Sequence, residues 1–176
     1  DGHDVTVLCR SADSAMYQSK RAGRGRYTYY DAALNPSGQR LYTLERQLPR
    51  AIQDNELVLH FQPKVQLSDM RVTGLEALVR WYHPHWGQVS PADFIPLAEE
   101  AGLIQGLGAL VLWQSCRDLA RLQKSGFPDL QMSINRSTLE FQTIDPEANE
   151  WLRVIRHFDL DPADIIIEIT ESLLME

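Results

Sequence analysis

Four stretches of the chain alternate hydrophobic and polar residues with a period of two, the pattern of a β-strand with one buried face. Each stretch carries apolar side chains on one face and polar side chains on the other, at or near its C-terminal end. The predicted strands cover residues 57–62, 72–81, 130–135 and 165–170.

Apolar residues recur at helical spacing in segments before and between these strands. Ser90 followed by Pro91 also has the pattern of an N-cap and a first helical residue, which predicts the start of another helix. Strands separated by helices, with polar groups at the strand ends, predict an α/β fold, either a barrel or an open sheet. The predicted helices cover residues 4–22, 41–55, 104–124 and 146–158, and a short strand is expected at 24–30.

One strand places Glu76, Leu78 and Arg80 on the same face, so that an acid and a base project together from an apolar element. The next two strands end similarly, in Asn135 and Glu168. Two carboxylates and an amide oxygen fit a hard divalent cation such as Mg²⁺, and a guanidinium group matches phosphate oxygens. The plain alternative is a set of solvated polar residues with a salt bridge between Arg80 and Glu76. Recurrence on three strands favours a metal and phosphate site suited to phosphodiester cleavage.

A second candidate metal pair, His83 and His85, is weaker. Its spacing alone is not specific, it lies in a turn-like segment, and no Cys or His partners complete a ligand set. We therefore interpret these histidines as loop or packing residues.

Composition limits the class of protein. The 176 residues are 44% hydrophobic and 23% charged, which is typical of a soluble globular chain with a real core. A net charge of −7 argues against binding of DNA or RNA polymers, although a small anionic ligand remains compatible. Cys9 and Cys116 are interpreted as reduced, buried thiols of a cytoplasmic protein, with a disulfide as the alternative. No membrane span or signal peptide is visible, but an anchor elsewhere in the parent protein remains compatible.

The ends of the chain suggest an internal fragment of a longer protein, since it begins with Asp1 and stops within a helix-like segment. Turn-forming residues at 35–38 indicate a linker. The expected organisation is a first region at 1–34, a linker at 35–43 and a second region at 44–176.

Five motifs follow one another along the second region: FQPK at 61–64, GLEALVRW at 74–81, FIPLAEEAGLI at 94–104, SINRS at 133–137 and EITES at 168–172. Their order and spacing resemble the EAL domain of cyclic di-GMP phosphodiesterases. Residues 10–24 resemble the last helix of a GGDEF diguanylate cyclase domain, which often precedes an EAL domain in one chain. The resemblance implies an incomplete (β/α)8 TIM-like barrel with an irregular first strand, preceded by a helix–strand remnant of a GGDEF domain.

The resemblance also implies roles for individual residues. Glu76, Asn135 and Glu168 would be ligands of Mg²⁺ or Mn²⁺, with Glu76 and Glu168 as the catalytic carboxylates. Glu171 would brace a neighbouring loop, and Asn135 would also touch the nucleotide. The remaining nucleotide contacts would come from Gln62, Leu78 and Arg80.

The implied reaction is hydrolysis of cyclic di-GMP to linear pGpG in bacterial second-messenger signalling. A barrel of this type needs roughly 250 residues, so the parent protein is expected to be the enzyme and the fragment to be inactive. The alternative is a degenerate EAL domain that acts as a cyclic di-GMP receptor. The expected partners are the nucleotide, a second EAL domain in a homodimer, and upstream sensory and GGDEF regions of the same chain.

Overall fold

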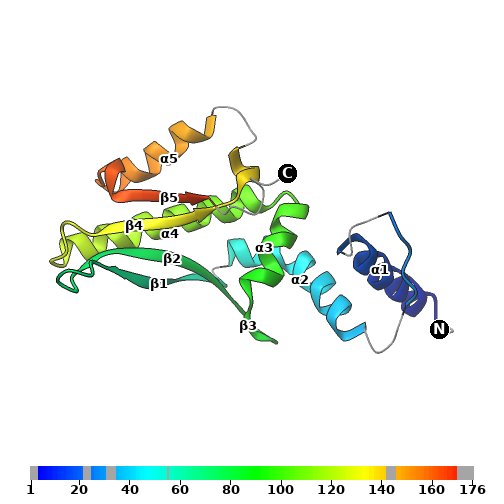
Figure 1. Cartoon of the computed structure of the whole chain (residues 1–176). Coiled ribbons are helices and arrows are strands. Elements are labelled where there is room, and N and C mark those ends of the chain that lie inside the picture. Colours follow the sequence, from blue (N-terminus) through cyan, green and yellow to red (C-terminus); the bar gives the residue numbers. More distant parts are fainter. Residues whose placement is uncertain (1–3, 22–24, 31–34, 55, 142–145, 170–176) are drawn as a thin grey trace. The chain divides into compact units, whose positions relative to one another are not determined.

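The computed structural model describes residues 4–21, 25–30, 35–54, 56–141 and 146–169. The chain divides into two compact units, Asp1–Arg50 and Ala51–Glu176, which are described separately. Helices α1 (Val5–Arg21) and most of α2 (Asn35–Gln53) belong to the first unit, and the sheet and the other helices belong to the second (Figure 1).

In the first unit, helix α1 confirms the helix expected at 4–22. Ser19 on this helix donates a hydrogen bond from its hydroxyl to the Thr28 hydroxyl at 2.8 Å. The strand expected at 24–30 is wrong, because residues 25–30 adopt no strand. A strand needs a hydrogen-bonded neighbour, and the described part of this unit contains no other strand.

Helix α2 begins at Asn35, several residues before the start expected near residue 41. The turn expected at 35–38 is therefore wrong. Pro36 is compatible with helix here because a residue in the first turn needs no intrahelical N–H partner. The apolar stripe of the helix is buried, with Leu44 and Leu48 both fully inaccessible to solvent.

The second unit is built on a five-stranded sheet in the order β1-β2-β4-β5, with β3 paired to β2. Strand β1 is antiparallel to β2, whereas β2, β4 and β5 are mutually parallel. The four predicted strands are confirmed. The first of them runs antiparallel to its neighbour in the α/β sheet, which agrees with the expected irregular first strand. The bounds are β1 Leu57–Val65, β2 Val72–His83, β3 Gly87–Val89, β4 Gln131–Arg136 and β5 Ile165–Ile169.

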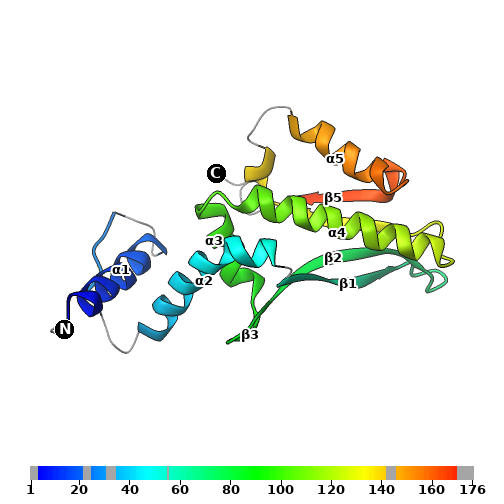
Figure 2. The ribbon, with the colours of Figure 1, turned by 180° about the vertical axis from the view of Figure 1, so that it is seen from behind.

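Helices connect the parallel strands, as the sequence predicts. Strand β2 is followed by β3 and by α3 (Pro91–Glu100) and α4 (Ile104–Lys124), and α5 (Pro146–His157) joins β4 to β5. Ser90 is the N-cap of α3 by its extended backbone, although its side chain makes no capping hydrogen bond. Helix α4 runs along one face of the sheet, seen from both sides in Figures 1 and 2.

The core lies between α4 and this face of the sheet. Trp81 is fully buried, its ring meets Phe94 edge-on with centroids 5.7 Å apart, and its indole N–H donates to Glu56 at 3.0 Å. The opposite face of the sheet is left uncovered by helices among the described residues. The other buried strand residues on the helix side include Ala77, Met132 and Ile134.

Both cysteines are free, and the expectation that both are buried is half right. Cys116 is buried in α4, and burial raises the pKa of its thiol to about 12. Cys9 is exposed on α1. Within the described residues, no helix has the length and apolar composition needed to cross a membrane.

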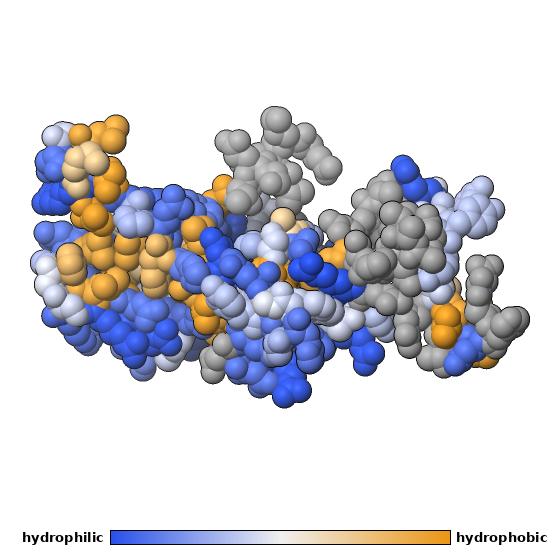
Figure 3. Space-filling view, turned by 90° about the horizontal axis from the view of Figure 1, so that it is seen from below, coloured by the Kyte–Doolittle hydropathy of each residue, from blue (hydrophilic) through white to orange (hydrophobic). Residues whose placement is uncertain are grey.

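Apolar side chains also reach the surface of the second unit, and the view from below shows hydrophobic residues gathered toward one end of it (Figure 3). The β1–β2 hairpin contributes several of the exposed residues: Val58, Val65, Leu67, Met70 and Val72. Exposed apolar surface of this kind is typical of a face that packs against another segment.

Candidate metal and nucleotide site

The strand register places the predicted site residues on one face of the sheet, opposite α4. Gln62 on β1 pairs with Glu76 on β2, and Glu76 is in register with Ser133 on β4. Two residues further along β4, Asn135 is in register with Glu168 on β5. Because side chains alternate along a strand and directly paired residues share a face, all five point to the same side.

Glu76 and Asn135 are in direct contact. The Asn135 amide nitrogen donates a hydrogen bond to Oε1 of Glu76 at 2.7 Å, although the two residues are 59 positions apart in the sequence. The Asn135 carbonyl oxygen is not used in this contact. Since Asn135 is also in register with Glu168, its strand lies between the two strands that carry the carboxylates singled out in the sequence analysis.

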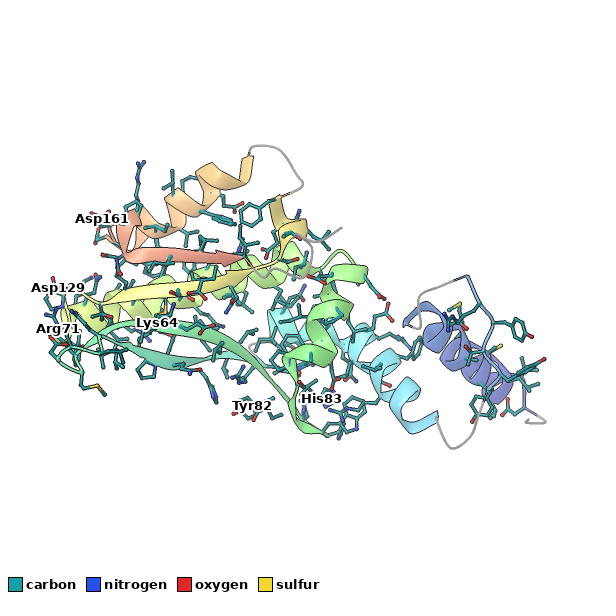
Figure 4. The ribbon with its side chains drawn as sticks, in the orientation of Figure 1. Lys64, Arg71, Tyr82, His83, Asp129 and Asp161 are labelled. Carbon is teal, nitrogen blue, oxygen red and sulfur yellow. The ribbon has the colours of Figure 1, made fainter. Side chains whose placement is uncertain are left out.

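Lys64 on β1 is a site residue that the sequence analysis did not assign. Its ammonium group donates a hydrogen bond to the Ser133 hydroxyl at 2.6 Å and forms an ion pair with Oε1 of Glu168. Figure 4 labels Lys64 on the hairpin of β1 and β2. The prediction ended the first strand at Gln62, but β1 continues to Val65 and so puts Lys64 on the same face as Gln62.

This ion pair also reports the shape of the sheet. Three strand spacings separate β1 from β5, each about 4.8 Å in a flat sheet. The contact between Lys64 and Glu168 therefore shows that the sheet curves toward the site face, as a sheet does when it forms part of a barrel.

The ion pair perturbs the Glu168 carboxyl group. The hydrogen bond from Lys64 is the main cause that holds the pKa of Glu168 below its ordinary value, and the Ser133 hydroxyl acts in the same direction, whereas partial burial opposes the shift. Glu168 is consequently ionised at neutral pH, which is the state a cation ligand needs.

The pKa of Glu168 leads to a prediction about stability and pH. A depressed folded-state pKa stabilises the fold above the ordinary pKa of 4.5, and this contribution is lost as the pH falls through the lower folded-state pKa. We expect the stability advantage of the wild type over Glu168→Gln, measured by urea unfolding, to shrink between neutral pH and pH well below 4.5. The same comparison in a Lys64→Met background should show little dependence on pH. An advantage that is constant with pH in the wild-type background would contradict the assignment.

The expected nucleotide residues lie on the same face. Leu78 pairs with His60 and Arg80 pairs with Val58 across the β1–β2 ladder. The Arg80 guanidinium donates to the Val79 carbonyl oxygen at 3.0 Å and, among the described residues, forms no ion pair with Glu76. The simple salt bridge considered as an alternative is therefore wrong.

A cavity of about 340 Å³ lies at the C-terminal ends of β2 and β4, beside α3 and α4. Leu78, Arg80 and Asn135 line it together with Glu99 of α3, with Arg136, Ser137 and Glu140 after β4, and with apolar residues of β2 and the two helices. An apolar cavity with a few convergent polar groups is a common form of ligand site.

A buried polar network holds the end of β4 where Asn135 lies. Arg136 and Glu140 form an ion pair at 2.9 Å, with 3% and 2% of their side chains exposed. The second Glu140 oxygen accepts the Ser137 backbone N–H at 2.9 Å, and the Ser137 hydroxyl donates to Glu99 on α3 at 2.6 Å. These contacts position the backbone directly after Asn135 and join β4 to α3.

Two other predictions concern residues outside this constellation. His83 is 4% exposed and stacks on Trp86 with ring centroids 4.3 Å apart, while its Nδ1 accepts the His85 N–H, so the packing interpretation is confirmed. The turn-like segment expected there is confirmed at residues 84–86, which form the turn of a short β2–β3 hairpin. Glu171 lies outside the described residues.

The oxygen atoms of the candidate ligands are of the kind that a hard cation prefers, but the ligands are few. Carboxylate and amide oxygens are the ligands that Mg²⁺ and Mn²⁺ accept, and Glu76, Asn135 and Glu168 share one face. Among the residues that the structure describes, no group of three or more His, Cys, Asp or Glu side chains could hold a metal ion. Two carboxylates and one amide would fill only part of the coordination sphere of such an ion.

An α/β sheet that curves toward a face bearing two carboxylates, an amide and a guanidinium defines an α/β protein whose described strands are consistent with part of a TIM-like barrel. The sequence matches the model of the EAL domain over residues 45–176, and the chain belongs to the EAL domain family.

Known relatives agree with this assignment. The chain is 37% identical over 178 residues, 99% of its length, to the bifunctional diguanylate cyclase/cyclic di-GMP phosphodiesterase MucR of Pseudomonas aeruginosa. It is also 37% identical, over 99% of its length, to the cyclic di-GMP phosphodiesterase PdeR of Escherichia coli. It spans 25% and 26% of the lengths of these two relatives.

A solved structure of PaMucR phosphodiesterase in complex with c-di-GMP is similar to this fold, with a TM-score of 0.71 and 36% sequence identity. The similarity covers 76% of this chain and 54% of the other. The α/β sheet therefore corresponds to part of an EAL domain.

Proposed function

We propose that the protein carrying this chain is a metal-dependent cyclic di-GMP phosphodiesterase that hydrolyses the nucleotide to linear pGpG. One observation carries the proposal: Glu76, Asn135 and Glu168 come from three neighbouring parallel strands and lie on the same face of the sheet, with Asn135 bonded to Glu76 and in register with Glu168. Relatives of this chain are cyclic di-GMP phosphodiesterases, which supports the substrate.

The roles of the residues follow from their chemistry. Glu76, Asn135 and Glu168 would hold Mg²⁺ or Mn²⁺ through oxygen atoms. The bound ion would supply a Lewis acid for the phosphoryl oxygen and lower the pKa of water. Gln62 and Arg80 would orient the substrate, since a guanidinium group binds phosphate oxygens in a fixed geometry.

The apolar contact in this arrangement is Leu78, which lies between the rows of Glu76 and Arg80 and would pack against the nucleotide. Glu171 would brace a loop near Glu168. By itself the chain is expected to be inactive, because the two carboxylates and one amide of its described residues would fill only part of a coordination sphere.

The proposal extends to the organisation of the parent protein. Residues 1–34 would be the remainder of a GGDEF domain and residues 35–43 a linker. The relation to MucR covers 99% of the chain, whereas the EAL match begins at residue 45, so the preceding residues also have a counterpart in a bifunctional relative. The proposed setting is the cytoplasm, with sensory regions upstream and a homodimer formed through the EAL domain.

The experiment is a product assay on the protein at its natural length. Cyclic di-GMP is incubated with Mg²⁺, with Mn²⁺ or with a chelator, and the linear dinucleotide is resolved by chromatography. We expect product with either metal and none with the chelator. Saturable nucleotide binding without product would instead identify a receptor, and absence of both would remove the nucleotide as the ligand.

A further inference from the structure

The ion pair of Lys64 has no role in the function proposed above, yet it touches one of the three proposed metal ligands. Lys64 comes from the only strand of the described site that runs opposite to the others, so its side chain approaches from the N-terminal ends of β2 and β4. Its direct partner in the ladder is Gly74. Because glycine adds no side chain to the face, the lysine side chain has room to cross β2 and reach β4 and β5.

The ammonium group is held by two partners. It donates to Ser133, whose side chain is 1% exposed, and it contacts a single oxygen, Oε1, of Glu168. Ser133 is in register with Glu76, so the ammonium group lies on the row of residues that carries the first carboxylate. The lysine therefore contacts one residue in register with Glu76 and also contacts Glu168 itself.

Glu168 needs such a restraint. Its side chain is 34% exposed, so packing alone does not restrict it to one rotamer. Holding a free glutamate in one conformation when a metal binds costs side-chain entropy. A hydrogen bond that already orders the carboxylate removes part of that cost.

We propose that Lys64 is a positioning residue that orders the Glu168 carboxylate for metal binding through the contact with Oε1, with Ser133 as its second anchor. The inference rests on the metal site of the proposed function. It predicts the direction in which the affinity for metal changes when Lys64 is removed. A lysine that were merely a nearby positive charge would repel the metal, so its removal would tighten metal binding. A positioning lysine has the opposite effect.

The test measures Mn²⁺ binding to the natural-length protein, with free Mn²⁺ followed by electron paramagnetic resonance. We expect Lys64→Met to weaken Mn²⁺ binding by about tenfold or more, the usual effect of losing a partner that orients a metal ligand. Lys64→Arg should restore much of the affinity, because a guanidinium group can donate to the same oxygen. The matched control is Arg71→Met, which removes a positive charge of the same hairpin that pairs with Asp69 on the surface, and it should leave Mn²⁺ binding unchanged.

Three outcomes would overturn the inference. Unchanged or tighter Mn²⁺ binding by Lys64→Met would show that the lysine does not position Glu168. An additive loss in the double variant Lys64→Met/Glu168→Gln would show that the two residues act separately. Absence of Mn²⁺ binding by the wild type would reject the proposed metal site itself, and the positioning role with it.

A second variant guards against a folding defect in Lys64→Met. Ser133→Ala removes one anchor of the ammonium group while changing little volume, and we expect weaker Mn²⁺ binding in the same direction. Wild-type Mn²⁺ affinity both in Ser133→Ala and in a folded Lys64→Met protein would equally overturn the proposal. Circular dichroism and thermal unfolding of each variant separate a change in metal affinity from a loss of fold.

Discussion

Replacing Glu76 by alanine is expected to lower the rate of cyclic di-GMP hydrolysis by about a thousandfold, equivalent to about 4 kcal/mol of transition-state stabilisation. The substitution removes a carboxylate from the three proposed metal ligands and leaves Asn135 without the acceptor it binds at 2.7 Å. Turnover with saturating Mn²⁺ in the natural-length protein is the measurement.

The fold should tolerate this substitution. Glu76 is half-buried on the uncovered face of the sheet, and the loss of one side-chain hydrogen bond costs about 1 kcal/mol. The matched control is Asp129→Ala, which removes an exposed carboxylate just before β4, at the opposite end of the sheet from His83 (Figure 4). Full activity of Glu76→Ala, or an equal loss in the control, would contradict the assignment of Glu76 to the catalytic centre.

Replacing Glu140 by alanine is expected to destabilise the second unit by about 3–5 kcal/mol, because it leaves the guanidinium group of Arg136 buried without its carboxylate partner. Packing prevents a simple rearrangement. Arg136 lies over the ring of Trp151, 4.0 Å from its centroid, and a Cβ on Gly108 of α4 would collide with the Glu140 carboxylate and with Arg136. Urea unfolding at neutral pH measures the change in the free energy of unfolding.

The control for this prediction is an ion pair that is only partly buried. Arg117 and Asp118 on α4 are 2.8 Å apart, but the arginine side chain is 40% exposed, so Asp118→Ala should cost at most about 1 kcal/mol. A Glu140→Ala cost as small as that of Asp118→Ala would contradict the role of the buried pair. Replacing both Arg136 and Glu140 by apolar residues should cost less than Glu140→Ala alone, since no buried charge then remains unpaired.

The Glu140 network also affects the site. Glu140 accepts the backbone N–H of Ser137, two residues after Asn135, so its loss should loosen the end of β4. A folded Glu140 variant is therefore expected to bind Mn²⁺ more weakly than the wild type at temperatures where both are native.

Much of the second unit could be predicted from the sequence. The strands at β1, β2, β4 and β5 and the long helix α4 were predicted with bounds close to those observed, because their hydrophobic periods are long and regular. The errors lie where local patterns are short. Residues 25–30 have strand-like composition but no strand partner in the described part of their unit, and the residues at 35–38 resemble a turn although Pro36 suits the first turn of a helix.

In the candidate site, too, some residues could be predicted from the sequence and one could not. Glu76, Asn135 and Glu168 could be selected in advance because each is a polar residue in an otherwise apolar strand, and the motifs around them resemble the EAL family. Lys64 could not be selected with them, because the predicted strand ended at Gln62. Extending the alternation by two residues would have placed Lys64 on the right face.

The sequence by itself determined which side chains share a face of each strand and which residues belong to helices, because both follow from backbone geometry over a few neighbouring residues. The motifs in the sequence also identify the family. Only the tertiary structure decided that β1 runs against β2, that Asn135 reaches Glu76, and that Lys64 crosses Gly74 to meet Glu168. Strand order, strand direction and sheet curvature come from contacts between segments far apart in the sequence, up to 104 residues for Lys64 and Glu168, and no local pattern encodes them.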